Sequence, residues 1–363
     1  MSQLFSPLTI KSITLRNRIG VAPMCQYSAV EGVAQAWHMS QLGSKAVGGA
    51  GLVMAEATAV LPEGRITPAC MGLWNDEQVD ALQPITAFIK QQGAVPGVQL
   101  AHSGRKGSSA PPWLGGAQLS DEDGGWQTVG PTDTPFDDDG TRLWKAPKQM
   151  TQGDIDQVQA GFVAATQRAL AAGYQFLEIH CAHGYLLHSF LSPLVNTRSD
   201  TYGGDLKNRA RLLLETTEKV RAVWPQNLPL AVRLSMTDWT ENGLSVNDNI
   251  QVAGWLKELG VDLVDCSSGG ATPASRGSIN GGIAQQVGMA ADLRQGTGLM
   301  TMAVGEITQA QQAEDIIANR QADIVLLARA MLRDPYWPTH AAQELGVDIA
   351  QLMPPLHKFF IGS

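Results

Sequence analysis

The sequence predicts an α/β protein built on a (β/α)8 (TIM) barrel, and three observations support this prediction. Short apolar runs alternate with amphipathic stretches along the 363 residues, as in a parallel sheet that helices cover on both faces. Eight such runs occur, which is the strand number of a closed barrel. No GxGxxG follows an early run, and the alternative, an open doubly wound sheet, is expected to carry that motif.

The eight apolar runs are the predicted strands. Several of them, such as GLVMAEAT and IVLLAR, are apolar almost throughout, as expected for strands that are buried on both faces. The predicted strands lie at 18–24, 51–58, 95–102, 176–183, 230–236, 263–269, 299–305 and 324–329.

The clearest predicted helix covers residues 152–172. Its apolar residues Ile155, Val158 and Phe162 recur at helical spacing. Thr151 precedes it as a predicted N-cap, and Gly173 follows it as a predicted C-cap. Further helices are predicted at 76–92, 206–223, 246–259, 308–318 and 335–345. Three of these are expected to end at glycines: Gly93, Gly260 and Gly346.

Residues 103–150 interrupt the strand–helix repeat. The segment is rich in Gly, Pro and Asp and contains Trp113, Trp126 and Trp144. It follows the third strand at the end where the active sites of barrel enzymes lie, and a loop of this length is usually functional. We therefore predict one barrel domain over residues 1–363 with a capping insertion, a lid or hairpin, at 103–150. The alternative is a tolerated surface insertion.

Composition excludes several classes of function. The net charge is −8 and no basic block is present, so we expect no nucleic-acid partner. No apolar run reaches the ~18 residues of a membrane span, and the N-terminal residues lack a signal-peptide pattern. The four cysteines are scattered without a close pair, which is typical of free thiols in a cytosolic protein. We therefore predict a cytoplasmic location.

The predicted strands end in residues, many of them polar, that a simple apolar core would not contain. In a barrel these strand ends converge on one mouth, so residues far apart in the sequence are predicted to meet there. The residues in question are Met24, Cys25, Gln26, Tyr27, Glu56, Ala57, Thr58, Gln99, His102, His180, His183, Tyr185, Arg233, Ser267, Ser268, Gly305, Ala328 and Arg329.

Residues of the fifth, seventh and eighth predicted strands indicate an anionic ligand. Gly305 and Arg329 follow strands seven and eight, where many barrels bind phosphate through backbone N–H groups. Arg233 lies inside a strand, where an unpaired guanidinium is costly. It is therefore either a buried ion pair, with Glu178, Glu56 or Asp265, or a fixed charge beneath a ligand such as a flavin.

The stretch EIHCAHGYLLHSF, residues 178–190, holds three of the seven histidines. His180 and His183 with Glu178 could bind a metal, but strand alternation directs Cys181 away from His180. The metal site stays an alternative here, and we predict none. We assign His188 to packing or to a helix surface.

Long motifs in this order resemble the Old Yellow Enzyme family of FMN-dependent ene-reductases, in particular its thermophilic-like and xenobiotic reductase subgroup. The motifs span almost the whole chain, and the one at 178–215 is highly specific. They are APMCQYSA (22–29), GLVMAEATAVLPEGR (51–65), VQLAHSGRK (98–106), EIHCAHGYLLHSFLSPLVNTRSDTYGGDLKNRARLLLE (178–215), AVRLS (231–235) and ARAMLRDP (328–335).

The resemblance implies a tightly but non-covalently bound FMN. By this resemblance the backbone at Pro23, Met24 and Cys25 flanks the flavin ring, Ala57 and Gln99 lie near its pyrimidine side, Arg233 faces N1 and O2, and Gly305, Ala328 and Arg329 hold the phosphate. Many relatives have glycine where Ala328 stands, and backbone contact is expected to survive that change.

The resemblance also implies the catalytic residues. His180 and His183 are expected to bind the carbonyl oxygen of an activated alkene, and Tyr185 to protonate the alkene carbon. Tyr27 is expected to reach the same oxygen, and Cys25 to tune the flavin's redox potential.

The predicted function is reduction of the C=C bond of activated alkenes, including unsaturated carbonyl and nitro compounds, by ping-pong kinetics with NADPH or NADH. We expect a homo-oligomer, a dimer or tetramer. Some relatives insert a C-terminal arginine into a neighbouring site; this chain has Lys358, Phe359 and Phe360 there instead. The alternatives are a metal-dependent aldolase or isomerase barrel, which would need a strand-end lysine or carboxylate cluster, and a non-enzymatic flavin-binding protein, which would lack the histidine pair or Tyr185.

Overall fold

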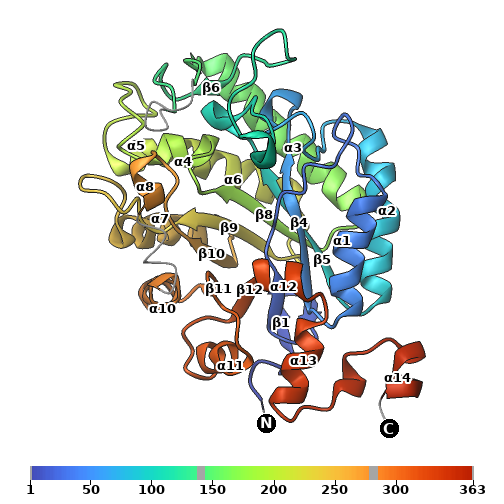
Figure 1. Cartoon of the computed structure of the whole chain (residues 1–363). Helices are drawn as coiled ribbons and strands as arrows, with labels where there is room; N and C mark the ends of the chain where they lie inside the picture. Colours follow the sequence, from blue (N-terminus) through green and yellow to red (C-terminus); the bar gives the residue numbers. More distant parts are fainter. Residues whose placement is uncertain (1, 137–143, 278–284, 362–363) are drawn as a thin grey trace.

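The computed structural model describes residues 2–136, 144–277 and 285–361. Eight parallel strands pair side by side into a closed barrel, and helices surround it (Figure 1). This confirms the (β/α)8 barrel. The barrel strands are β3 (Ile19–Val21), β4 (Leu52–Ala59), β5 (Val95–Ala101), β8 (Phe176–Cys181), β9 (Leu230–Ser235), β10 (Leu263–Ser267), β11 (Met300–Val304) and β12 (Ile324–Leu327).

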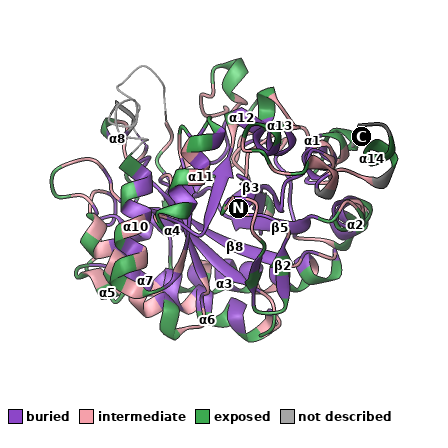
Figure 2. Cartoon of the chain, turned by 90° about the horizontal axis from the view of Figure 1, so that it is seen from below, coloured by how far each residue is buried: buried purple, intermediate pink, exposed green. Residues whose placement is uncertain are grey.

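All eight strands lie within one or two residues of their predicted positions, except that several end earlier at the mouth. The residues beyond the observed strand ends, such as His183 and Ser268, belong to the loops that follow the strands. Burial explains why the apolar runs predicted the strand positions. Nearly every strand residue is buried, whereas the helices carry exposed outer faces (Figure 2).

The helices follow the strands in the order of a (β/α)8 chain. They are α1 (Ala36–Val47), α2 (Asp76–Gln91), α3 (Gln152–Ala171), α4 (Leu186–Leu191), α5 (Leu206–Arg209), α6 (Arg211–Val223), α7 (Val246–Glu258), α8 (Ala274–Gly277), α10 (Gln285–Thr297), α11 (Ala310–Ala318), α12 (Arg329–Arg333), α13 (Trp337–Glu344) and α14 (Pro355–Ile361). The sequence did not predict α1 or α10, nor the shorter helices α4, α8, α12 and α14. The single helix predicted at 206–223 is wrong, because Ala210 separates α5 from α6.

The caps of α3 show how local sequence sets helix ends. The Thr151 hydroxyl accepts a hydrogen bond from the Asp154 N–H, and the Asp154 carboxylate accepts one from the Thr151 N–H. This reciprocal capping box satisfies donors that the first helical turn leaves free. At the other end Ala172 is the C-cap, and Gly173, with a φ of 88°, is the next residue. The predicted helix end was therefore displaced by one residue.

The lower end of the barrel is closed by an N-terminal hairpin that the sequence did not predict. Its antiparallel strands are β1 (Leu8–Ile10) and β2 (Ile13–Leu15). Their apolar side chains form one cluster with residues inside the barrel, such as Leu52 and Phe176. A second, larger cluster fills the space between the strands and the helices. The hairpin side chains therefore plug the lower end of the barrel.

The predicted insertion at 103–150 contains little regular structure in its described parts. It has the 3-10 turns η2 (Gly104–Lys106) and η3 (Pro112–Leu114), and the short strands β6 (Val129–Gly130) and β7 (Lys148–Gln149). These strands pair in parallel. The segment joins the main body through hydrogen bonds, including one from the Trp126 indole to the Glu63 carbonyl. Further 3-10 turns are η1 (Pro62–Gly64) and η4 (Ile349–Gln351).

Among the residues that the structure describes, no helix is both long enough and apolar enough to cross a bilayer.

Candidate active site

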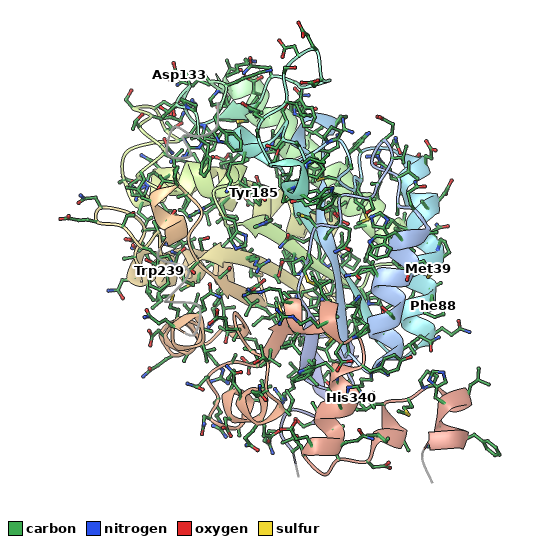
Figure 3. All side chains as sticks on the ribbon, viewed as in Figure 1. Met39, Phe88, Asp133, Tyr185, Trp239 and His340 are labelled. Atoms are coloured by element: carbon green, nitrogen blue, oxygen red, sulfur yellow. The ribbon has the colours of Figure 1, made fainter. Side chains whose placement is uncertain are left out.

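Three aromatic side chains meet where β8 gives way to α4. The ring of His180 lies 5.2 Å from that of His183 and 5.1 Å from that of Tyr185, measured between ring centres, with edge-to-face orientation in both pairs. Tyr185 precedes α4 at the upper end of the barrel in Figure 3. The structure therefore brings together the three residues that were predicted from the HCAHGY stretch.

Both imidazoles are held in the neutral form. Burial lowers the pKa of His180 and of His183 well below the ordinary value, and the nearby charge of Arg233 lowers both further. The Nδ1 of His180 accepts a hydrogen bond from the Ala182 N–H at 3.2 Å. Its hydrogen consequently lies on Nε2, which can donate to a ligand. The Nε2 of His183 lies 2.7 Å from the Ser267 hydroxyl.

The loop that carries these residues packs backbone against backbone on the loop that follows β10. A Cβ atom on Gly184 would lie 2.0 Å from the carbonyl oxygen of Gly270, and one on Gly270 would lie 2.7 Å from His183. Gly184 also has a φ of 75°. A side chain at Gly184 would therefore push the two loops apart and strain the backbone.

Arg233 lies beside His180 in the paired register of β8 and β9. Its Nε is 2.9 Å from the Asp265 carboxylate on β10. Of the three carboxylates that the sequence left open as partners, Asp265 is thus the one in direct contact. Arg233 also lines the main cavity, so the ion pair and the fixed charge facing a ligand are compatible.

Gln99 and Glu178 form a second buried pair, one strand further along the barrel. They are partners in the register of β5 and β8, and the Gln99 amide donates to the Glu178 carboxyl at 2.7 Å. Burial raises the pKa of Glu178, and the neighbouring Asp265 raises it further, whereas Arg233 and the Gln99 hydrogen bond oppose the shift. The side-chain amide of Gln99 is therefore held in a fixed orientation.

Cys25 and Tyr27 lie in the loop after β3. Burial raises the pKa of the Cys25 thiol well above its ordinary value, and Glu56 adds to the shift, so the group is a neutral thiol. Burial also raises the pKa of Tyr27. The Tyr27 ring contacts Trp113 edge to face, with 5.7 Å between ring centres. Trp113 belongs to the predicted insertion, which thus reaches the Tyr27 side of the mouth.

Glu56 supports this loop in a way that sequence reasoning missed. The strand register shifts between Ala55 and Ala57, and such a bulge redirects a side chain. The Glu56 carboxylate accepts a hydrogen bond from the Gln26 N–H at 3.0 Å and lies 3.3 Å from His38. A glutamate inside an apolar strand was the available signal, because a buried carboxylate requires partners.

A cavity of about 540 Å³ opens beside the aromatic cluster. His183 and Arg233 line one side of it, and the residues after β11 and β12 line the other. It brings together seven of the residues predicted at the mouth with one further cation, Arg333, and further polar groups. The lining includes His183, Arg233, Ser267, Ser268, Gln286, Gly305, Ala328, Arg329 and Arg333.

The cavity fits an anionic ligand such as the phosphate of a flavin nucleotide. Arg329 and Arg333 supply guanidinium groups, which suit phosphate oxygens. Gly305, with a φ of 117°, leaves its backbone open to a close approach. Met24 lies elsewhere, against a small pocket with Gln26 and Glu56. Within the described ranges, no three His, Cys, Asp or Glu side chains are grouped as a metal site would need.

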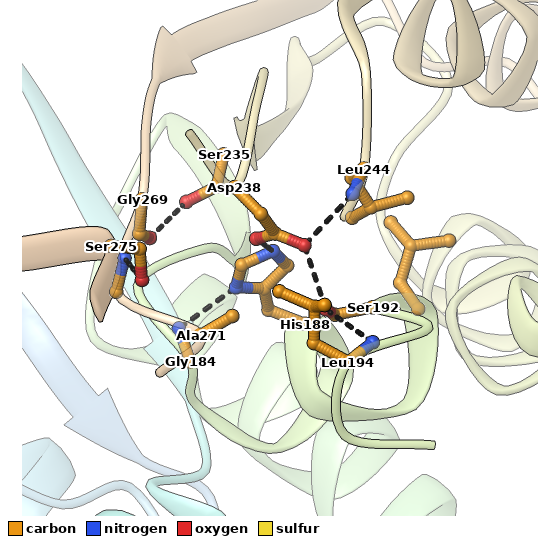
Figure 4. A network of polar contacts seen from close by, with 12 residues as sticks. Gly184, His188, Ser192, Leu194, Ser235, Asp238, Leu244, Gly269, Ala271 and Ser275 are labelled. Carbon is orange, nitrogen blue, oxygen red and sulfur yellow. Dashed lines mark hydrogen bonds and ion pairs between the residues drawn. The ribbon is translucent and has the colours of Figure 1, made fainter. Parts of the chain in front are cut away.

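His188 makes polar contacts that its prediction did not include. Its side chain is completely buried, its Nδ1 accepts a hydrogen bond from the Gly184 N–H at 2.8 Å, and its Nε2 lies 3.2 Å from Asp238. It is therefore part of a polar network behind the aromatic cluster (Figure 4). Its burial confirms packing and rules out a helix surface, and its polar contacts add to the packing.

Comparison with known proteins finds relatives along almost the whole chain. A model of the NADH:flavin oxidoreductase / NADH oxidase family matches residues 3–348. NADPH dehydrogenase of Bacillus licheniformis is 44% identical over 349 residues, covering 96% of each chain. NADPH dehydrogenase of Geobacillus sp. (strain WCH70) is 43% identical over 351 residues, also covering 96% of each chain.

Solved structures share the fold. Morphinone reductase in complex with tetrahydroNAD is similar at 24% identity with a TM-score of 0.76, over 94% of this chain and 90% of that one. A 2-naphthoyl-CoA reductase complex with 2-naphthoyl-CoA is similar at 24% identity with a TM-score of 0.83, over 96% of this chain and 53% of that longer one. The chain belongs to the NADH:flavin oxidoreductase / NADH oxidase family, which is the Old Yellow Enzyme family of the sequence motifs, and it is an oxidoreductase that uses FMN and NAD(P)H.

Proposed function

We propose that this enzyme reduces the C=C bond of activated alkenes, such as α,β-unsaturated carbonyl and nitro compounds, by a ping-pong mechanism. The observation that carries the proposal is the meeting of His180, His183 and Tyr185 at the mouth, beside a cavity that suits a flavin nucleotide. Two imidazole donors and a phenol are the groups that addition of a hydride and a proton to such an alkene requires.

The two imidazoles would bind the oxygen of the activating group. A bound FMN would supply the hydride, taken from NAD(P)H, that adds to the β-carbon of the alkene. Negative charge then develops on the substrate oxygen. Neutral, buried N–H donors stabilise such charge without the cost of reorganising water, and one such donor typically contributes roughly 3 kcal/mol. Tyr27, on the opposite loop, would reach the same oxygen.

Tyr185 would supply the proton. Its hydroxyl would protonate the α-carbon on the face opposite the hydride, as a positioned general acid. Its ring already contacts His180, and Lys106 lies 5.2 Å from the ring centre. The tyrosinate formed by the transfer would therefore face a cation.

The cofactor would be held along the mouth. In this arrangement Arg329, Gly305 and the backbone at Ala328 hold the phosphate, and Arg233 faces the N1 and O2 side of the ring. We assign the remaining contacts to the strand ends that face them. These are the backbone at Pro23 and Met24, the Cys25 thiol at the N5 side, Ala57, and the Gln99 amide, with the whole cofactor bound tightly but non-covalently.

We also propose a homo-oligomer in which the C-terminal segment contacts a neighbouring subunit. Phe359 lies in α14 and is 80% exposed, and α14 lies at the periphery of the fold in Figure 1. A dimer or tetramer would cover this apolar side chain.

The visible absorption spectrum of the purified protein tests the proposed function. We expect a flavin spectrum that bleaches on anaerobic addition of NADPH and returns when cyclohexenone is added. Bleaching without recovery would contradict alkene reduction. A colourless protein that takes up no added FMN would contradict the whole assignment.

A further inference from the structure

The buried network behind the aromatic cluster has no part in the mechanism described so far. His188 belongs to α4 and Asp238 to the loop after β9, and both side chains are completely buried (Figure 4). Neither residue lines the main cavity. Any effect of His188 and Asp238 on the reaction must therefore be transmitted through other residues.

The hydrogen bonds define the state of the His188 ring. Its Nδ1 accepts from the Gly184 N–H at 2.8 Å, so Nδ1 carries no hydrogen and the ring's N–H is at Nε2. That nitrogen faces Oδ1 of Asp238 at 3.2 Å. The ring thus receives a hydrogen bond on one side and lies within ion-pair distance of a carboxylate on the other.

Asp238 is itself held by fixed donors. Its Oδ2 accepts from the Ser192 hydroxyl at 2.7 Å and from the Leu244 N–H at 2.9 Å. Burial acts to raise the pKa of Asp238, but the contact with His188 and the hydrogen bonds outweigh it, and the net pKa is lowered. The carboxylate is therefore ionised and anchored, and it can fix the orientation of the imidazole.

The backbone N–H that donates to the His188 ring belongs to Gly184, which lies between two predicted catalytic residues. Gly184 stands directly between His183, an imidazole donor, and Tyr185, the proposed proton donor. His183 and Gly184 both have left-handed backbones, with φ of 60° and 75°, and this conformation is uncommon for a residue other than glycine. Such a turn needs support, and the Ser235 hydroxyl accepts the His183 N–H at 2.9 Å while His188 accepts the next one.

We propose that His188, oriented by Asp238, is a positioning residue that sets the His183–Tyr185 turn and thereby the placement of the proton donor relative to the oxyanion-binding imidazoles. This inference rests on the proposed function. It assigns His188 no contact with substrate or cofactor. A displacement of about 1 Å at a reacting group can cost roughly 100-fold in rate, so the pair would affect chemistry more than binding of the cofactor.

The two nitrogens of His188 can be replaced one at a time. In His188→Asn the amide oxygen takes the place of Nδ1 and can still accept from Gly184. In His188→Gln the amide nitrogen takes the place of Nε2 and can still face Asp238, but the acceptor for Gly184 is lost. If the buried pair only stabilises the fold, the glutamine variant, which keeps the contact with Asp238, should have the rate closer to that of the wild type. If His188 acts by accepting the Gly184 N–H, the asparagine variant should have the closer rate.

The experiment compares these variants as FMN-loaded proteins. Reoxidation of the reduced enzyme by cyclohexenone is followed by stopped flow at saturating enone, and binding of 4-hydroxybenzaldehyde is followed in the flavin spectrum. We expect His188→Gln to lose roughly 10- to 100-fold in the reoxidation rate, with FMN affinity unchanged and phenol affinity reduced. His188→Asn should stay within a few-fold of the wild type. His340→Leu, which removes an exposed His–Asp pair, is the control and should change neither reading.

The same experiment separates this inference from the proposed function. Tyr185→Phe reports on the proton donor alone, and in a Tyr185→Phe background His188→Gln should cause little further loss of rate. If Tyr185→Phe slows reoxidation but His188→Gln does not, the positioning role is wrong and the proposed function stands. If wild-type enzyme is not reoxidised by the enone at all, the proposed function is wrong. Equal loss in the asparagine and glutamine variants would also overturn the positioning role.

Discussion

The Nε2 of His183 lies 2.7 Å from the hydroxyl of Ser267, although the two residues are 84 positions apart in the sequence. The contact joins the loop after β8 to the end of β10, past the intervening strand β9. It restrains the imidazole ring and leaves Nδ1 as the nitrogen that can face a ligand. Ser267 is therefore expected to support the binding of the substrate oxygen.

Replacement of Ser267 by alanine tests this contact. The loss of one hydrogen bond is worth about 1 kcal/mol, so we expect kcat/KM for cyclohexenone to fall roughly 5-fold. Affinity for 4-hydroxybenzaldehyde should fall by a similar factor. Ser268→Ala is the matched control, because Ser268 bonds Gln286 and not an imidazole. Equal effects of the two replacements would show that Ser267 does not act through His183.

Replacement of Tyr185 by phenylalanine tests the proton donor. The protein should remain yellow, and NADPH should still bleach it, because hydride transfer to the flavin needs no phenol. Reoxidation by the enone should slow by roughly 100-fold or more, the usual contribution of a general acid. Stopped-flow traces of the two half-reactions give both rates. Tyr202→Phe, which removes a hydroxyl bonded to Glu215, is the control, and a Tyr185→Phe rate equal to that of the control would exclude Tyr185 as the donor.

Replacement of Arg329 by alanine tests the phosphate site. A charge-assisted hydrogen bond is worth about 1.5–3 kcal/mol, so FMN should bind the apoprotein roughly 10- to 100-fold more weakly. Riboflavin has the same ring without the phosphate, and its affinity should not change. Quenching of flavin fluorescence measures both. If riboflavin binding falls as much as FMN binding, Arg329 does not contact the phosphate.

The buried carboxyl of Glu178 predicts how stability depends on pH. Its pKa in the folded protein is raised above the ordinary value of 4.5, chiefly by burial. The folded state therefore holds this proton more tightly than the unfolded chain does, and the resulting stabilisation is complete below pH 4.5 and is lost as the pH rises through the folded pKa.

Glu178→Gln removes this ionisation and keeps the shape of the side chain. Over the pH range above 4.5, we expect the Tm of the wild type to fall relative to that of the variant as the pH rises. Thermal unfolding followed by circular dichroism at several pH values gives the comparison. Parallel curves would mean that Glu178 keeps an ordinary pKa in the folded protein.

Part of the active site could be read from the sequence because it depends on local order. His180, His183 and Tyr185 follow one strand within six residues, so any fold that ends that strand at a mouth places them together. The proposed phosphate site could also be predicted from the sequence, because Gly305 and Arg329 directly follow two consecutive strands. The eight strands themselves were evident, since burial on both faces requires continuous apolar runs.

Other parts depend on contacts between distant segments. The helices α1 and α10 were missed, and the hairpin β1–β2 was recognised as the plug of the barrel only from its packing. The bulge that turns Glu56 toward His38 is a matter of strand register. No local periodicity encodes such a shift, because it arises where two paired strands differ by one residue.

The sequence by itself determined the barrel, its strand order and the identity of the groups at its mouth, because periodicity and residue chemistry are local properties. Only the tertiary structure decided which partners those groups have. It paired Arg233 with Asp265 among three possible carboxylates, and it placed His188 against Asp238, 50 residues away. The physical reason is that a buried polar group must find a partner wherever packing brings one within reach, and that position is set by the assembled barrel.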